Sequence, residues 1–321
     1  MVETDTNSER DDRDFEWPVP WTPVEGTRGG VFAWMEHLAL RAAMTSMARL
    51  PGFLLTPMIG GLARLGRLVD KKHTSDARKF IRQALGDKLT QAELDEAVLQ
   101  AYRHLIGITI RTEAWGRKIS EDNWREHVTV EFSPEFEALK GKGSILVTPH
   151  LGDWEAAAAL MPKLGYSPVY AIAKPPKNLP LSRHVQRSRE ARGVRMLPRR
   201  GGIQYAAQVV RGGGLLCLLI DQRGRGRNVL APFFGRPSLC DRSAGVLLKR
   251  LKVPISIGAV YLTDKPYHFR VHAKTVLEPA EFASQSVEEL ITLINGELEG
   301  LILQAPEQYF WLHDRYRGAP E

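Results

Sequence analysis

The sequence predicts an α/β protein in which a mixed sheet is flanked by helices and preceded by a helical region. Two observations carry this prediction. From about residue 128 onward, short apolar runs of the β type alternate with helix-like segments, the pattern of a sheet with helices on its faces. Between about 31 and 119, apolar residues recur instead at three- and four-residue steps, as in amphipathic helices. At 321 residues and 43% hydrophobic composition, the chain is long enough to bury a sizeable core.

Residues 1–27 are expected to form a disordered leader. Their start is acidic and polar, whereas a secretory signal is basic and then apolar, so export is not predicted. The periodic pattern that follows indicates a helical region over 28–125, with a break at Pro51. Within it, Thr90 opens the sequence T-Q-A-E, a capping box in front of a helix from Ala92.

The first two predicted helices combine apolar faces with Arg and Lys at their edges, and this composition leaves two alternatives open. They are ordinary helices packed on a core, or they lie in the headgroup layer of a membrane. A transmembrane helix is not expected, because one needs about 18 uninterrupted apolar residues. The closest approach, residues 50–66, contains two prolines and an arginine.

The α/β part is predicted over 126–321, integrated with the helical region in one domain. Strands are expected at 144–148, 168–172, 215–220, 255–261 and 268–273, with helices at 154–164, 182–192, 204–211 and 244–251. A last helix over 287–303 precedes the aromatic segment P-E-Q-Y-F-W-L-H-D-R-Y-R, for which the sequence indicates no mechanistic role.

Positive charge is concentrated in one stretch of the chain. Residues 170–252 hold 14 Arg and 4 Lys against three acidic residues, a net charge of +15, whereas the whole chain carries +7. Such a field attracts an anionic partner: phosphate-bearing lipid, an acidic carrier protein or nucleic acid. The alternative is a set of solvated arginine-rich helix faces. Cys217 and Cys240 lack C-x-x-C spacing, so no disulfide framework is predicted and a reducing compartment fits.

The candidate chemistry lies at the first strand of the α/β part. His150 follows the strand S-I-L-V-T, at the edge where open α/β sheets bind ligands. Asp153 is placed to cap the next helix, and Glu155 falls in its first turn. From there Glu155 can accept the Nδ1–H of His150 and leave Nε2 to take a proton. The alternative is that Glu155 only complements the helix dipole, a common role for acidic residues in a first turn.

Other catalytic arrangements are not indicated. No G-x-S-x-G sequence supplies a serine nucleophile. No H-E-x-x-H and no close His/Cys cluster suggests a metal site, so neither a metal nor a cofactor is predicted.

Several ordered motifs make this sequence resemble the late acyltransferases of lipid A biosynthesis and the related phosphatidylinositol mannoside acyltransferases. They are T-P-H-L-G-D-W-E at 148–155, S-R-E-A-R-G at 188–193, D-Q-R at 221–223, P-F-F-G-R-P at 232–237 and the closing segment at 306–317. An H-x-x-x-x-D/E pattern alone is weakly specific, whereas the ordered set is specific. The resemblance covers about 31–317.

The resemblance implies a glycerolipid-acyltransferase-like fold and direct transfer from an acyl thioester to a lipid hydroxyl. His150 is then the general base and Glu155 its orienting carboxylate, while Arg189 stabilises the oxyanion or grips a substrate phosphate. Asp221 either orients Arg189 or another cation or binds acceptor hydroxyls, and Gln222 and Arg223 extend that substrate-binding loop. Phe233 and Phe234 either shape a groove for the acyl chain or fill the core.

The resemblance also implies the partners. The donor is acyl carrier protein or acyl-CoA, and the acceptor is a glycolipid such as a lipid A precursor. Members often begin with a membrane anchor. An acidic leader and interrupted amphipathic helices are expected here instead, so peripheral binding at the cytoplasmic face of the inner membrane is expected. Asp153–Trp154 replaces the usual Asn–Trp and preserves helix capping.

Three alternatives stay open at this point. The acceptor is a mannosylated or other glycolipid rather than a lipid A precursor, or the chain binds anionic lipid without catalysis, or the basic stretch binds nucleic acid. No helix-turn-helix, zinc finger or RNP-like motif accompanies the charge, so no nucleic-acid partner is predicted.

Overall fold

A seven-stranded mixed sheet forms the centre of the molecule in the computed structural model, which describes residues 25–86, 89–198, 202–224 and 226–320. The strand order is β1-β9-β8-β2-β5-β3-β4. All neighbours are parallel except β8 and β9, which are antiparallel. The strands are β1 (Val128–Phe132), β2 (Ser144–Thr148), β3 (Val169–Ala173), β4 (Val194–Pro198), β5 (Leu215–Leu219), β8 (Ile255–Leu262) and β9 (Phe269–Leu277). The predicted fold class is confirmed.

Both faces of the sheet are covered, and this explains the continuous apolar strands. Successive side chains of a strand point to opposite faces. Ile145 and Val147 accordingly pack into one hydrophobic core, and Leu146 into a second core on the other face. The helices of the α/β part are α5 (Pro134–Glu137), α6 (Trp154–Leu160), α7 (Leu179–Glu190), α8 (Gly202–Arg211), α9 (Arg242–Leu251), α10 (Pro279–Phe282) and α11 (Val287–Gln304).

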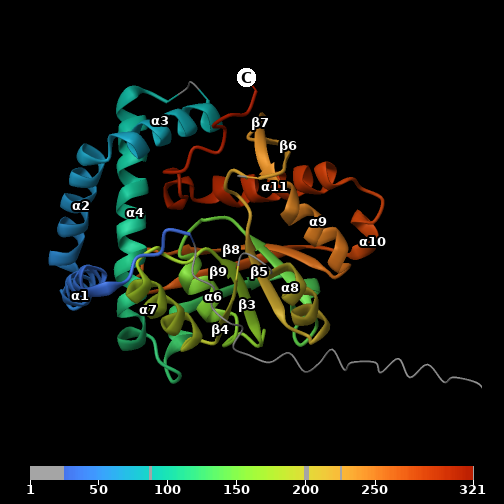
Figure 1. Cartoon of the computed structure of the whole chain (residues 1–321), viewed down its shortest axis with the longest axis horizontal. Helices are drawn as coiled ribbons and strands as arrows, with labels where there is room; N and C mark the ends of the chain where they lie inside the picture. Colours follow the sequence, from blue (N-terminus) through green and yellow to red (C-terminus); the bar gives the residue numbers. More distant parts are fainter. Residues whose placement is uncertain (1–24, 87–88, 199–201, 225, 321) are drawn as a thin grey trace, which may run out of the picture.

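The N-terminal region consists of helices, as predicted. The long helix α4 (Gln91–Lys118) stands beside the sheet, and α1 (Gly30–Met47), α2 (Gly52–Val69) and α3 (Lys71–Leu85) pack against it (Figure 1). The capping box at Thr90 is confirmed: its hydroxyl accepts from the Glu93 N–H, and the Glu93 carboxylate accepts from the Thr90 N–H. None of the helices in the described residues is long and apolar enough to cross a membrane.

The structure adds elements that the sequence did not reveal. Strands β1 and β4 were missed, and so was the two-stranded hairpin of β6 (Asn228–Phe233) and β7 (Arg236–Asp241). Helix α7 begins three residues earlier than predicted because the Asn178 side chain caps it. Most of the predicted leader, 1–24, lies outside the described residues, and the division into regions stays a prediction.

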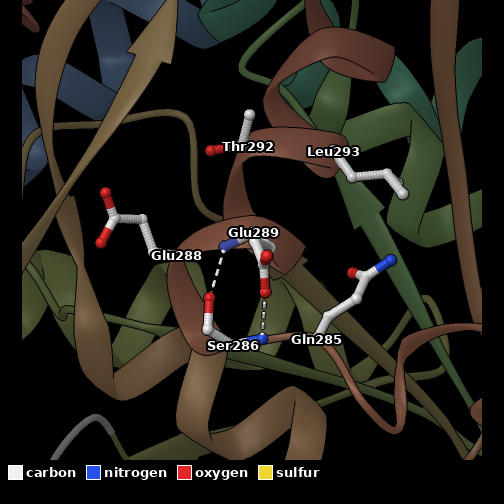
Figure 2. A pocket seen from close by; sticks show the side chains of 6 residues that line it. All are labelled: Gln285, Ser286, Glu288, Glu289, Thr292 and Leu293. Atoms are coloured by element: carbon white, nitrogen blue, oxygen red, sulfur yellow. Dashed lines mark hydrogen bonds between the residues drawn. The ribbon is translucent and has the colours of Figure 1, made fainter.

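Helix α11 begins with a further capping box at the rim of a hollow of about 550 Å³. Figure 2 shows the two reciprocal bonds: the Ser286 hydroxyl accepts from the Glu289 N–H at 3.1 Å, and the Glu289 carboxylate accepts from the Ser286 N–H at 2.6 Å. The polar groups at this helix start are thus already paired with each other. Gln285, Glu288, Thr292 and Leu293 also line this hollow.

Candidate active site

His150 and Asp221 occupy equivalent positions beyond two neighbouring parallel strands. In the register of β2 and β5, Thr148 lies opposite Leu219, and the two candidate residues each follow two positions later. The carboxyl ends of parallel strands meet at one edge of a sheet, so this register brings the two side chains together.

The contact between them uses both oxygens of the carboxylate. The distance from His150 Nδ1 to Asp221 Oδ1 is 2.7 Å, and the His150 backbone N–H donates to Asp221 Oδ2 at 2.9 Å. The side chain of Asp221 is 1% exposed and that of His150 is 20% exposed. Burial opposes ionisation of Asp221, but the charge and hydrogen bonds of His150, aided by Arg315, hold its pKa below the usual value. An ionised Asp221 fixes the proton on Nδ1 and leaves Nε2 for a substrate.

Glu155 does not make the contact with His150 that the sequence suggested. Its carboxylate instead accepts from Arg189, with Nε–Oε2 at 3.0 Å and a second bond from Nη2 to Oε1. Burial would raise the pKa of Glu155, but the neighbouring Arg189 outweighs it and lowers the pKa. The reason for the correction is geometric: Glu155 leaves the first turn of α6 toward the last turn of α7, while Nδ1 faces the end of β5.

The loop that carries His150 is held by a close backbone approach. Gly152 has φ +58°, and a Cβ at this position would come within 1.7 Å of the Val260 carbonyl oxygen. Its N–H donates to the Gln308 carbonyl at 3.0 Å, and the Phe310 N–H donates to the His150 carbonyl at 2.9 Å. The C-terminal segment, which had no role in the sequence analysis, thus fixes this loop.

Aromatic rings surround the imidazole. Trp154 meets it edge-on with ring centroids 5.3 Å apart, and Phe310 lies 6.0 Å away. The two aromatic rings are themselves 6.1 Å apart. These rings give the base an apolar border. The Thr148–Glu155 motif contains Trp154, whereas nothing in the sequence connected Phe310 with this loop.

Two polar residues of α4 contact the loop that carries His150. Arg111 pairs with Asp153 at 3.1 Å, and Asp153 also caps α6 by accepting the Ala156 N–H. His104 Nε2 lies 2.8 Å from the Gly152 carbonyl oxygen, so that nitrogen carries the proton. Burial, with a smaller effect of Arg111, lowers the pKa of His104 to about 4. His104 is therefore a neutral donor at ordinary pH.

The other predicted site residues lie at different distances from this centre. Gln222 Nε2 is 3.4 Å from His150 Nε2, a long contact. Arg223 donates to the Arg317 carbonyl. Phe233 is fully buried against Phe80, which favours the core alternative, and its substrate-binding role stays a prediction. Phe234 sits partly buried in the turn between β6 and β7, with φ +48°.

Metal ligands are not clustered in the part of the chain that the structure describes: no group of three or more His, Cys, Asp or Glu side chains could hold an ion there. The sequence expectation that neither metal nor cofactor takes part stays a prediction.

The fold and the site together define an α/β protein with a histidine–carboxylate pair at the carboxyl edge of its sheet, an arrangement suited to general-base chemistry. The chain belongs to the bacterial lipid A biosynthesis acyltransferases, because the model of that family matches residues 32–318. A lipid A biosynthesis acyltransferase of Haemophilus influenzae is 28% identical over 211 residues. That match covers 64% of this chain and 61% of the relative, so it spans less than two thirds of the relative's length. The resemblance seen in the sequence is confirmed, and the chain is classed with the acyltransferases.

Proposed function

We propose that the protein transfers a fatty acyl group from an acyl thioester to a hydroxyl of a glycolipid, a lipid A precursor, with His150 as general base. The observation that carries this proposal is the buried Asp221 carboxylate on Nδ1 of His150, at 2.7 Å, which leaves Nε2 as the basic nitrogen. Membership of the lipid A acyltransferase family supports the substrate class.

In the proposed reaction, Nε2 of His150 takes the proton of the acceptor hydroxyl while its oxygen attacks the thioester carbonyl. The tetrahedral intermediate then expels the thiolate, and the imidazolium returns the proton to that sulfur. No acyl-enzyme forms. Asp221 keeps the tautomer and stabilises the imidazolium while it exists. General-base assistance of this kind is worth about 10²- to 10⁴-fold in rate.

Arg189 supplies fixed positive charge to the site in this proposal. Its Nε and Nη2 are held by Glu155, so the guanidinium has a defined orientation. Positive charge near the reacting carbonyl stabilises the developing oxyanion, and a guanidinium equally suits a substrate phosphate. Glu155 therefore acts through Arg189 rather than on the imidazole.

The donor in this proposal is an anionic thioester, either acyl carrier protein or acyl-CoA. The basic stretch of the sequence supports that choice, since many of its cationic side chains are exposed: Lys174, Arg183, Arg187, Arg211, Arg227, Arg236, Arg242 and Arg250. Exposed positive charge speeds the encounter with an acidic partner. Gln222 and Arg223, at the end of β5, extend the substrate-binding edge.

We further propose that α1 and α2 rest on the cytoplasmic face of the inner membrane, as a peripheral contact. On α1, the buried residues are Ala33 and the polar His37, whereas most of the large apolar side chains before Met44 are exposed. The helix also docks through polar bonds, since Asn178 donates to the Ala33 carbonyl. The exposed apolar side chains of the two helices are Val31, Phe32, Trp34, Met35, Leu38, Leu40, Phe53, Leu54, Leu65, Leu68 and Val69. An apolar face of this size suits the headgroup layer of a lipid surface.

The experiment is acyl transfer by the purified full chain, with radiolabelled acyl carrier protein or acyl-CoA thioesters and a lipid A precursor in detergent. Wild type should label the glycolipid, and His150→Ala should lose that activity. The matched control is His73→Ala, because His73 is an exposed histidine of α3 paired with Asp70. Absence of labelling by folded wild type with either donor and with total membrane lipid would overturn the proposal.

A further inference from the structure

Arg315 is a fully buried arginine whose direct partners are all neutral. Its Nη2 donates to Asn295 Oδ1 at 2.8 Å and contacts Cys240 Sγ at 3.3 Å, and its Nη1 donates to the Ile220 carbonyl at 3.4 Å. The guanidinium carbon also lies 4.1 Å from the ring centre of Phe233. Among the residues that the structure describes, no carboxylate forms an ion pair with Arg315.

A buried charge without a counter-ion is costly, so its location needs an explanation. The residue that follows Ile220 is Asp221, a buried carboxylate whose direct partner is a histidine. Asp221 and Arg315 thus place one negative and one positive buried charge near each other without direct contact. The positive charge of Arg315 also helps to lower the pKa of Asp221.

Both charges act on the pKa of Tyr309. Burial raises the pKa of its hydroxyl well above the usual value, Asp221 raises it further, and Arg315 opposes this rise. The C-terminal segment that carries Tyr309 and Arg315 therefore surrounds the carboxylate of the histidine pair with one hydroxyl and one cation.

We propose that Arg315 is a positioning residue of the active site: it keeps Asp221 ionised and holds the end of β5 in place, so that His150 retains its acceptor. This inference rests on the proposed function of the His150–Asp221 pair. Arg315 touches neither substrate nor imidazole, and it acts only through Asp221.

Loss of the Arg315 charge should move the titration of the His150–Asp221 pair in one definite direction. His150 and Asp221 share a short hydrogen bond, so they bind and release protons as a unit. Removing a nearby positive charge raises the proton affinity of that unit, whichever atom holds the proton. Protonation of the pair should then occur at higher pH. Glu155, which is paired with Arg189, also interacts with His150, and the Glu299 carboxylate interacts with Arg315. None of these groups is changed in the experiment.

The experiment follows the imidazole of His150 by NMR in the full chain with labelled histidine, with His150→Ala assigning the signal. Arg315→Met should move the titration of the pair upward by about 0.5 to 1 pH unit, the order expected for loss of one neighbouring charge. Arg315→Lys keeps the charge and should restore most of the wild-type titration. The low-pH limb of kcat/KM for acyl transfer should move with the NMR titration.

A second variant covers the case in which Arg315→Met does not fold. Asn295→Asp gives Arg315 a carboxylate at the position of its 2.8 Å partner and so offsets the charge while keeping the side chain. It also removes the bond from Asn295 Nδ2 to the Pro232 carbonyl, so Asn295→Ser is the matched control that loses the bonds without adding charge. Asn295→Asp should shift the titration of the His150–Asp221 pair to higher pH, and Asn295→Ser should not.

The outcomes separate the two proposals. An unmoved titration in folded Arg315→Met and Asn295→Asp, or an equal effect of Arg315→Lys and Arg315→Met, would overturn the role of Arg315 and leave the acyltransferase proposal standing. A titration that moves as expected in a protein without acyl transfer would instead support the positioning role and overturn the proposed function.

Discussion

His150 donates two hydrogen bonds to Asp221, one from its ring Nδ1–H and one from its backbone N–H, and each goes to a different carboxylate oxygen. One carboxylate therefore fixes the backbone of the loop after β2 and the tautomer of the imidazole at the same time. The pairing crosses 71 positions of the chain and depends on β2 and β5 being neighbours in the sheet.

Asp221→Asn should lower kcat by about 10³-fold, because an amide does not hold the proton on Nδ1 as a carboxylate does. Glu155→Gln should lower kcat less, since Glu155 contacts Arg189 and not the imidazole. Steady-state acyl transfer by the two variants measures this order. Asp241→Asn, at the partly exposed N-cap of α9, is the control and should keep full activity. A larger loss in Glu155→Gln would return the orienting role to Glu155.

The pair of Glu155 and Arg189 should contribute to stability as a unit. Glu155→Gln leaves a largely buried guanidinium without its counter-ion and should lower the free energy of unfolding by about 1–3 kcal/mol. The double variant with Arg189→Gln should recover at least half of that loss, as measured by urea denaturation. Glu96→Gln, in the exposed pair with Arg103, should cost no more than about 0.5 kcal/mol. If the losses of unfolding free energy in the two single variants simply add up in the double variant, Glu155 and Arg189 do not act as a unit.

Gly152 should tolerate no side chain. Gly152→Ala places a Cβ 1.7 Å from a backbone oxygen at a positive φ, and we expect a loss of at least about 2–3 kcal/mol in unfolding free energy together with loss of acyl transfer. Gly300→Ala is the matched control, because no atom lies within 4 Å of the added Cβ on helix α11. There alanine should stabilise by about 0.5–1 kcal/mol. Thermal unfolding of both variants provides the comparison.

The sequence predicted those parts of the fold that depend on local patterns. Strand β2 was predicted at its observed bounds, because the apolar run I-L-V ends at T-P-H, and α11 was predicted to within one residue. Strand β4 was missed because its V-R-M-L-P pattern is short, carries an arginine at its second position and ends in proline. The hairpin of β6 and β7 was missed because its turn, Phe233 to Arg236, lacks the usual Asn–Gly or Asp–Gly signal.

The candidate site was harder to predict, because it is assembled from distant parts of the chain. His150 and Asp221 were both selected from their places after apolar strands. Their pairing follows only from the strand order, which apolar patterns do not specify. Glu155 was predicted to contact His150 because it lies only five residues away, but in the first turn of α6 its side chain points toward Arg189. The contact of Phe310 with His150 has no local signal at all.

Stability should depend on pH through His104. Its pKa is lowered from 6.5 to about 4 in the folded protein, so between these values the unfolded chain binds a proton that the folded protein does not. The free energy of unfolding therefore decreases as the pH falls from about 6.5 toward 4, by up to about 1.4 kcal/mol per pH unit. His104→Gln removes this titration and should flatten the slope relative to wild type. Urea denaturation at pH 7, 5.5 and 4.5 measures it, and equal slopes would contradict the assignment.

The exposed faces of α1 and α2 should determine membrane binding. Phe32 and Phe53 are 83% and 77% exposed, and burying each ring in a lipid surface is worth roughly 1.5–3 kcal/mol. The double variant Phe32→Ser, Phe53→Ser should therefore bind vesicles of phosphatidylethanolamine and phosphatidylglycerol at least about tenfold more weakly in a flotation assay. Leu303→Ser removes an exposed apolar side chain from α11 and should bind as wild type does. Equal binding by all three proteins would reject the two helices as the membrane contact, whereas loss in Leu303→Ser alone would move that contact to α11.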